Sequence, residues 1–150
     1  MPRAAASPRL DDMLHQTMPD DELGVMEFLE AFALSLTEGA TDALADLWQL
    51  PAMVISDDRT FTVSDRDELK DLFAGAREQY NSAGVTDTRP QIIRLDEITD
   101  RIVMVRVRWP HLDEDGDELG AECSTYTLQL SALGDWKIRC AVLHGCEALN

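Results

Sequence analysis

The sequence is poor in basic residues, and this shortage argues against several classes of partner. Lysine and arginine together number 13, against 29 aspartates and glutamates, so the formal net charge of the 150 residues is −16. A field of that sign repels phosphates, and we therefore expect neither nucleic acid nor an anionic membrane as a partner. No apolar run approaches the roughly 20 residues of a membrane-spanning helix. The first ten residues also lack the apolar segment of a secretory signal, so a cytoplasmic location is expected.

Cysteine is scarce as well. Only Cys123, Cys140 and Cys146 occur, their number is odd, and there is no C-x-x-C pair. This pattern predicts buried thiols rather than a disulfide, in agreement with a reducing compartment. Cys140 and His144 lie about 13 Å apart along a strand, whereas two ligands of one zinc ion each lie about 2 Å from the metal. The sequence therefore predicts no metal site.

Motifs of nucleotide-dependent and metal-dependent enzymes are missing. The sequence contains no glycine-rich phosphate loop, no H-E-x-x-H and no G-x-S-x-G, so no cofactor is expected. One acidic run, 113–118, alternates its acids as a calcium-binding loop does. Gly116, however, stands at the fourth position of that loop rather than the sixth, and Asp115-Gly116 is a strong hairpin signal. The run is therefore interpreted as a turn between strands.

The length favours a single domain, and a chain of this size can bury roughly 68–70% of its unfolded surface. Residues 1–16 show no periodicity and are interpreted as an N-terminal arm, while residues 17–150 form the domain. Within the arm, Leu10, Met13 and Leu14 are spaced as one amphipathic turn. We expect this turn to pack on the body of the domain.

Helical periodicity dominates the first half of the domain. Apolar residues recur every three or four positions, which predicts helices over about 17–38, 41–50 and 64–83. Each segment begins with a Thr or Ser that can cap a helix. Gly39 ends the first helix and Pro51 the second.

Alternating patterns dominate the second half and predict an antiparallel meander. The expected strands are about 52–56, 60–63, 86–98, 101–111, 118–132 and 136–144. Alternation assigns one set of side chains to the face that meets the helices: Val103, Val105, Val107, Trp109, Tyr126, Leu128, Leu130, Trp136, Ile138, Cys140, Val142 and His144. The opposite face receives a mixed set: Met104, Arg106, Arg108, Thr125, Thr127, Gln129, Lys137, Arg139, Ala141 and Leu143. A sheet curled around helices in this way leaves an apolar pocket inside.

This order of elements resembles the nuclear transport factor 2-like superfamily. The resemblance covers about 20–145 and rests on a helix, a short helix ending in Trp and Pro, a hairpin, a third helix and four long strands ending in Trp136-Lys137-Ile138. Ketosteroid isomerases, SnoaL-like polyketide cyclases and scytalone dehydratases belong to that superfamily. The resemblance implies an α+β fold in which a cone-shaped, curved, antiparallel or mixed sheet wraps around three N-terminal helices. It also implies a cavity at the wide end and dimers formed through the sheet.

The resemblance indicates where catalytic residues would lie. Isomerases of the superfamily carry a base carboxylate at the end of the first short strand, where this chain has Ser56. Asp57 follows directly, and it could act as the base or serve only in the hairpin turn. The first helix has Phe28 and Phe32 where the isomerases use a tyrosine donor.

Other candidates share the face of the sheet that meets the helices. His144 is a candidate general base, because histidine titrates near neutrality, and Tyr126 is a candidate proton donor. Trp109 and His111 follow each other on the same face as candidate ligand-binding residues, and Trp48 and Phe32 are candidate walls of the pocket. Tyr126 and the tryptophans could equally be core residues with one satisfied polar group, and His144, near the chain end, could equally be solvated or pack on the arm.

Three functions remain open at this point. The first is a domain that binds a small apolar ligand in its pocket. The second is an isomerase, dehydratase or cyclase that uses His144 or Asp57 with Tyr126. The third is a structural or interaction module whose pocket is filled by its own side chains.

The sheet face opposite the helices suggests a homodimer. It gathers four bases in an acidic chain: Arg106, Arg108, Lys137 and Arg139. Like charges repel, so two copies would have to pair these bases with acids that are near in the strand pattern: Asp96, Glu118 and Glu122. An isologous contact of this kind around a Met, Leu and Thr centre is expected.

Overall fold

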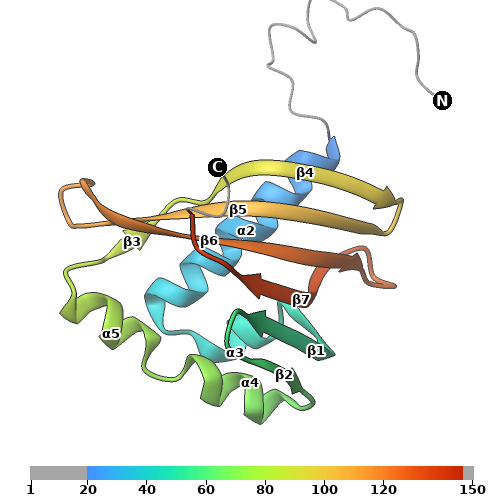
Figure 1. The fold of residues 1–150 in the computed structure, drawn as a ribbon, viewed down its shortest axis with the longest axis horizontal. Coiled ribbons are helices and arrows are strands. Elements are labelled where there is room, and N and C mark those ends of the chain that lie inside the picture. The colour runs from blue at the N-terminus through green and yellow to red at the C-terminus, as the bar shows by residue number, and fades with distance from the viewer. Residues whose placement is uncertain (1–19, 147–150) are drawn as a thin grey trace, which may run out of the picture.

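The computed structural model describes residues 20–146, which form helices packed against one curved sheet (Figure 1). The helices are α2 (Asp20–Glu38), α3 (Thr41–Ala45), α4 (Arg66–Phe73) and α5 (Ala76–Ser82). The strands are β1 (Trp48–Ser56), β2 (Thr60–Val63), β3 (Asp87–Thr88), β4 (Gln91–Thr99), β5 (Ile102–Leu112), β6 (Glu118–Leu130) and β7 (Trp136–Leu143). The arm predicted over 1–16, with its docking turn, lies outside the described residues, so the predicted division into arm and domain stays a prediction.

The sheet confirms the predicted α+β class. Its seven strands follow the order β2-β1-β7-β6-β5-β3, and β4 also pairs with β5. The β1–β7 pair is parallel and the other pairs are antiparallel, so the sheet is mixed. Figure 1 shows the long helix α2 crossing the sheet, with α4 and α5 along one margin. Within residues 20–146, no helix has the length and apolar character needed to cross a membrane.

The core lies between α2 and the middle strands. One stripe of α2 is buried, as the helical spacing predicts, and includes Val25, Leu29 and Phe32. Facing it are fully buried side chains from three adjacent strands: Val103, Val105, Val107, Leu128 and Ile138. Removing this apolar surface from water is the main force that holds helix and sheet together.

Two predicted elements are each divided in the structure. The helix predicted over 64–83 becomes α4 and α5, because the chain turns at Gly75, whose φ of 83° favours glycine. The capping residue of α4 is Asp65 rather than Ser64, and it forms a capping box with Glu68. The strand predicted over 86–98 becomes β3 and β4, which are separated around Pro90, a residue without an amide proton for the sheet.

The first strand begins earlier than predicted. Pro51 was expected to end a helix, but β1 already starts at Trp48 and passes through this proline. The pairing of β1 with β7 shifts register between Trp48 and Met53. A proline is tolerated in a strand at such an irregularity, because its missing N–H is not needed for a ladder hydrogen bond.

The last strand contains a bulge that reverses part of the predicted face assignment. Two consecutive residues of β6 pair with Ile138 and Cys140, so Arg139 is an extra residue in β7. Beyond the bulge, Ala141 faces the core and is 3% exposed. The prediction that Cys140 and Val142 share the helix-facing side was therefore wrong, because one inserted residue moves every following side chain to the other face.

Candidate functional site

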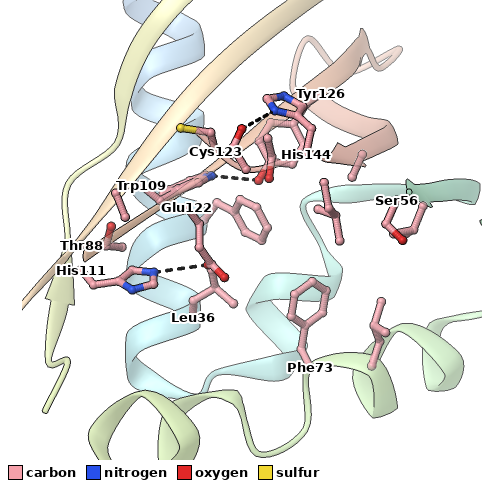
Figure 2. Close-up of a pocket in the computed structure, with 18 of the residues that line it drawn as sticks. Leu36, Ser56, Phe73, Thr88, Trp109, His111, Glu122, Cys123, Tyr126 and His144 are labelled. Atoms are coloured by element: carbon pink, nitrogen blue, oxygen red, sulfur yellow. Dashed lines mark hydrogen bonds and ion pairs between the residues drawn. The ribbon is translucent and has the colours of Figure 1, made fainter. Parts of the chain in front are cut away.

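A cavity of about 600 Å³ lies between α2, the β1–β2 hairpin, α4, α5 and the sheet. Most of its described lining is apolar, and much of that is aromatic (Figure 2). Arg59 is the only Lys or Arg, and Glu122 the only acid, among the described residues that line it. The space is therefore suited to a mainly apolar guest.

Phe32 of α2 forms the aromatic centre of this cavity. Its ring makes edge-on contacts with Trp48, Phe73, Trp109 and Tyr126, at centroid distances of 6.5, 6.2, 5.6 and 6.0 Å. Edge-to-face pairs of this kind are favourable beyond the area that they bury. The cluster ties α2, β1, α4, β5 and β6 together, so these elements hold the walls of the cavity in a fixed relation.

A buried hydrogen bond joins two of the predicted residues. The Trp109 Nε1–H donates to the Tyr126 hydroxyl at 3.0 Å, and the two side chains are 6% and 5% exposed. Burial raises the pKa of Tyr126 well above its ordinary value, while hydrogen bonds with Ser124 and Trp109 act in the opposite direction. Because an indole N–H only donates, the phenol oxygen accepts here. The phenol therefore stays protonated, and its own O–H is left for Ser124 or for a guest.

His111 has an acidic partner on the same wall. Its Nε2 lies 3.3 Å from a carboxylate oxygen of Glu122, and the Tyr80 ring lies 5.7 Å from the imidazole. Burial raises the pKa of Tyr80, and the charge of Glu122 adds to this effect. Among the contacts of residues 20–146, Nδ1 of His111 has no recorded partner. A carboxylate on Nε2 favours the proton there, which leaves Nδ1 as an open lone pair.

His144 also lines the cavity, but both of its ring nitrogens are engaged. Nε2 lies 2.8 Å from the Thr125 hydroxyl, and Nδ1 lies 2.9 Å from the carbonyl oxygen of Gly145. A carbonyl only accepts, so Nδ1 carries a proton and Nε2 of the neutral ring accepts from Thr125. His144 can act as a base only after the Thr125 hydroxyl turns away.

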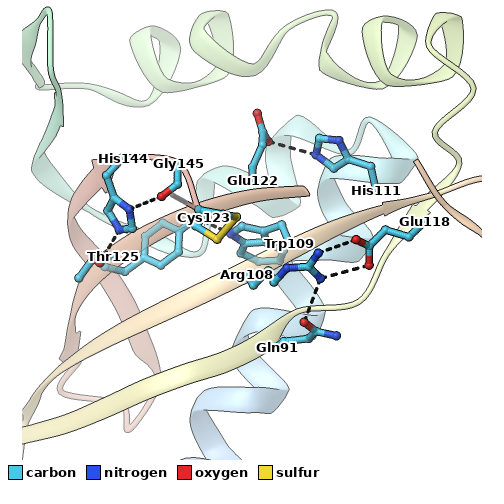
Figure 3. Close-up of a disulfide and its surroundings, with 12 residues drawn as sticks. Gln91, Arg108, Trp109, His111, Glu118, Glu122, Cys123, Thr125, His144 and Gly145 are labelled. Carbon is cyan, nitrogen blue, oxygen red and sulfur yellow. Dashed lines mark hydrogen bonds and ion pairs between the residues drawn. A yellow bond between two sulfur atoms is a disulfide. The ribbon is translucent and has the colours of Figure 1, made fainter. Parts of the chain in front are cut away.

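A disulfide joins Cys123 of β6 to Cys146 beyond the end of β7 (Figure 3). The prediction of buried thiols without a disulfide was therefore wrong for these two residues. Cys140 remains free and half-buried, and burial raises the pKa of its thiol. The pairing depends on the chain turning back after β7, which the spacing of cysteines in the sequence does not reveal.

The remaining predicted residues are placed as follows. Asp57 lies exposed in the β1–β2 turn and is not among the lining residues, whereas Ser56 is. Trp48 lines the cavity, and its Nε1 is buried without a hydrogen-bond partner in the described chain. Asp57 therefore lies in the hairpin turn, the second of the two roles considered for it.

The acidic loop between β5 and β6 brings ligand atoms of Asp113, Asp115 and Asp117 within 4.8 Å of one another. One carboxylate oxygen of Asp113 accepts the backbone N–H groups of Asp115 and Asp117, each at 2.9 Å. Gly116 has a φ of 85°. These bonds account for the turn, and the absence of a metal site stays a prediction.

Sequence reasoning did not place Tyr80, Ser124 or Glu122 at the cavity, and expected Glu122 only as an acid of the dimer interface. A signal for two of them was present, because Glu122 and Ser124 alternate with Tyr126 along one strand and so share its face. Tyr80 lies in the helix predicted over 64–83, for which no role in the pocket was predicted. Its approach to His111 depends on how α5 lies against the sheet, which no local pattern encodes.

Comparison with known families gives the class of protein. Residues 21–146 match the family described as NTF2-like protein (DUF6841). The chain therefore belongs to this NTF2-like family, and the resemblance to the nuclear transport factor 2-like superfamily is confirmed. No curated protein matches the sequence.

Solved structures agree on the fold. Aln2 from a Streptomyces species is similar, with a TM-score of 0.65 and 14% identity over 88% of this chain and 95% of that one. An NTF-2 like protein of unknown function from Shewanella oneidensis MR-1 has a TM-score of 0.63 and 17% identity, covering 85% and 99% of the two chains. A ketosteroid isomerase-like protein from Erwinia carotovora atroseptica has a TM-score of 0.61 and 14% identity, covering 85% and 98%. At such identities the likeness shows the cone fold alone.

Proposed function

We propose that this protein binds a small, neutral, largely apolar molecule in its cavity. The observation that carries the proposal is the cavity of about 600 Å³ with an aromatic centre and a few polar groups in its lining. Small-molecule sites are usually concave spaces of roughly 300–1,000 Å³ with this division of apolar and polar lining. A domain packed only for its own stability leaves few voids larger than a water molecule, so the cavity counts against a purely structural module.

The polar wall indicates the chemistry of the guest. Tyr126 accepts a hydrogen bond from Trp109, so the phenol O–H can be donated to an acceptor such as a carbonyl oxygen. A neutral guest is favoured over an anion, because the chain carries a net charge of −16 and Glu122 lines the same wall. We therefore expect a molecule with an apolar body and one carbonyl or similar acceptor.

The expected result is saturable binding of Prodan, a neutral fluorescent naphthyl ketone whose emission reports polarity and hydrogen bonding. Tyr126→Phe should weaken Prodan binding by about 2- to 13-fold, because a net hydrogen bond contributes roughly 1 ± 0.5 kcal/mol. Fluorescence titration measures both affinities. N-phenyl-1-naphthylamine, which has no carbonyl, is the matched control ligand and should bind the two proteins alike. If wild-type protein bound neither dye, the proposal would be refuted.

A second candidate function is proton transfer on the bound molecule, and the open Nδ1 of His111 favours it. Glu122 holds the opposite ring nitrogen at 3.3 Å, so Nδ1 can take a proton from a carbon next to a carbonyl. The electron pair then moves onto the carbonyl oxygen, where the Tyr126 hydroxyl stabilises it. Return of the proton to another carbon gives an isomer, and no co-reactant is needed. The superfamily likeness to a ketosteroid isomerase-like protein is compatible with this chemistry.

We also propose a homodimer through the sheet face opposite the helices. The strand registers place Met53, Cys140, Thr127 and Met104 in one row across β1, β7, β6 and β5. Both methionines are exposed, at 40% and 39%. This apolar row is the centre that a second copy would cover.

The charges around that row differ from the expected arrangement. Arg108 forms an ion pair with Glu118 of the same chain, and Arg94 with Asp96. No ion pair is recorded for Arg106 and Arg139 within residues 20–146, which leaves these two bases to contact acids of a partner.

Multi-angle light scattering should therefore give the mass of a dimer at tens of micromolar protein. Arg106→Glu should shift the equilibrium towards monomer, because it replaces an interface cation with an anion in an acidic assembly. Arg89→Glu makes the same charge change at a side chain that is 80% exposed in the β3–β4 link, and it should leave the dimer intact. A wild-type monomer, or equal effects of both variants, would contradict the proposal.

A further inference from the structure

The disulfide ties the segment after β7 to the wall of the cavity. Cys123 is 2% exposed within β6, and Cys146 lies 23 residues later, three residues beyond the end of β7. Gly145 has a φ of 77°, a conformation that lets the chain turn back towards β6. Figure 3 shows the ring of His144 and the carbonyl of Gly145 beside this link. The bond thus fixes a segment that no longer belongs to the sheet.

Non-covalent contacts alone hold this segment weakly. The backbone N–H groups of His144 and Gly145 both point to the carbonyl oxygen of Cys123, at 3.4 and 3.1 Å. The first distance exceeds the usual range for such a bond, and one oxygen shared by two donors satisfies neither fully. Among the hydrogen bonds of residues 20–146, the contact of the His144 ring with Thr125 is the other one that joins this segment to β6. The covalent link is therefore the main restraint on its position.

The same residues line the cavity. Cys123, His144 and Gly145 all belong to its wall. Resting on the proposed binding function, we propose that the Cys123–Cys146 disulfide is a redox-controlled closure: the oxidised form completes the cavity wall, and reduction releases residues 144–146 and weakens ligand binding. The free thiol of Cys140 does not compete in this exchange, because it lies opposite Thr127, four residues (about 13 Å) along β6 from Cys123, and burial raises its pKa.

The reducing step requires a dithiol. Its thiolate attacks the sulfur of Cys146, because Cys123 is buried, and Cys123 leaves as a thiolate. The second thiol of the reductant then attacks the mixed disulfide, Cys146 leaves, and the reductant becomes a cyclic disulfide. Two electrons and two protons pass from the dithiol to the two protein sulfurs. Reoxidation by a disulfide of higher potential runs the same steps in reverse.

The test compares Prodan binding to full-length protein before and after reduction with dithiothreitol. Thiol titration should rise from one to three per chain, since the chain has three cysteines and one is free in the oxidised form. Prodan affinity should fall about tenfold if the released segment occupies its closed position a tenth of the time. Cys146→Ser should bind as weakly without reductant and no longer respond to it. Cys140→Ser, which removes a thiol and keeps the link, should behave as wild type.

A second measurement does not depend on any ligand. The proton resonances of the imidazole of His144, assigned with His144→Gln among the three histidines of the chain, should shift on reduction and return on reoxidation. Full reduction with unchanged Prodan affinity and an unmoved His144 resonance overturns the inference while the proposed function stands. If the oxidised protein bound no dye, the proposed function itself would fail. In that case, an unmoved His144 resonance would also refute the inference that the disulfide holds residues 144–146 in place.

Discussion

Replacing His111 by Gln should slow base-catalysed elimination of 5-nitrobenzisoxazole in the cavity by about 10²- to 10⁴-fold, the usual contribution of a positioned general base. In this reaction the base removes one C–H proton, the N–O bond breaks, and a coloured nitrophenolate forms. The probe is neutral, flat and largely apolar, as the lining of the cavity demands. Glutamine preserves much of the volume of histidine but offers no basic nitrogen.

The variant His144→Gln is the matched control. Both nitrogens of His144 are engaged, by Thr125 and by the Gly145 carbonyl, so its loss should change the rate little. Glu122→Gln should give a partial loss, because the amide no longer fixes the proton on Nε2 of His111 or stabilises the charged imidazole. Absorbance of the product follows all four proteins, and a wild-type rate no higher than that of His111→Gln would refute the proton-transfer role.

The fold could be predicted from the sequence wherever a single periodicity dominates. The stripe on α2 and the alternation from Val103 to Trp109 each leave a single way to bury the apolar side chains. After Arg139 this condition fails, because residues of both parities are small or apolar. Alternation then cannot reveal a bulge, and the register of neighbouring strands decides which face Ala141 takes.

Only part of the candidate site could be predicted from the sequence, for a related reason. Trp109, His111 and Tyr126 lie on regular strands, so alternation alone brings them to one wall. The engagement of His144 by Gly145 and the link from Cys123 to Cys146 depend on a turn after the sheet ends. That turn follows the bulge, and the odd number of cysteines argues against a disulfide. The approach of two segments distant in sequence is set by packing of the whole domain, which local residue types do not specify.

The second large effect is expected in the centre of the sheet. Leu128→Ala should lower the free energy of unfolding by roughly 2–5 kcal/mol, the range for truncating a fully buried leucine. Leu128 is 0% exposed and pairs with Val103 on one side and Ile138 on the other, both equally enclosed. Rigid neighbours on both strands cannot move in to fill the space, so the loss of transfer free energy and the cost of the new void add together.

Thermal and urea unfolding measure this loss. For a domain of this size the melting temperature should fall by about 5–15 °C, and the urea midpoint should fall with an unchanged slope. Leu133→Ala makes the same chemical change at a side chain that is 90% exposed in the β6–β7 turn, and it should alter stability by no more than about 0.5 kcal/mol. Equal effects of the two substitutions would contradict the described core, because only burial distinguishes them. A large loss at Leu128 alone would show that burial at the centre of the sheet contributes strongly to the stability of the domain.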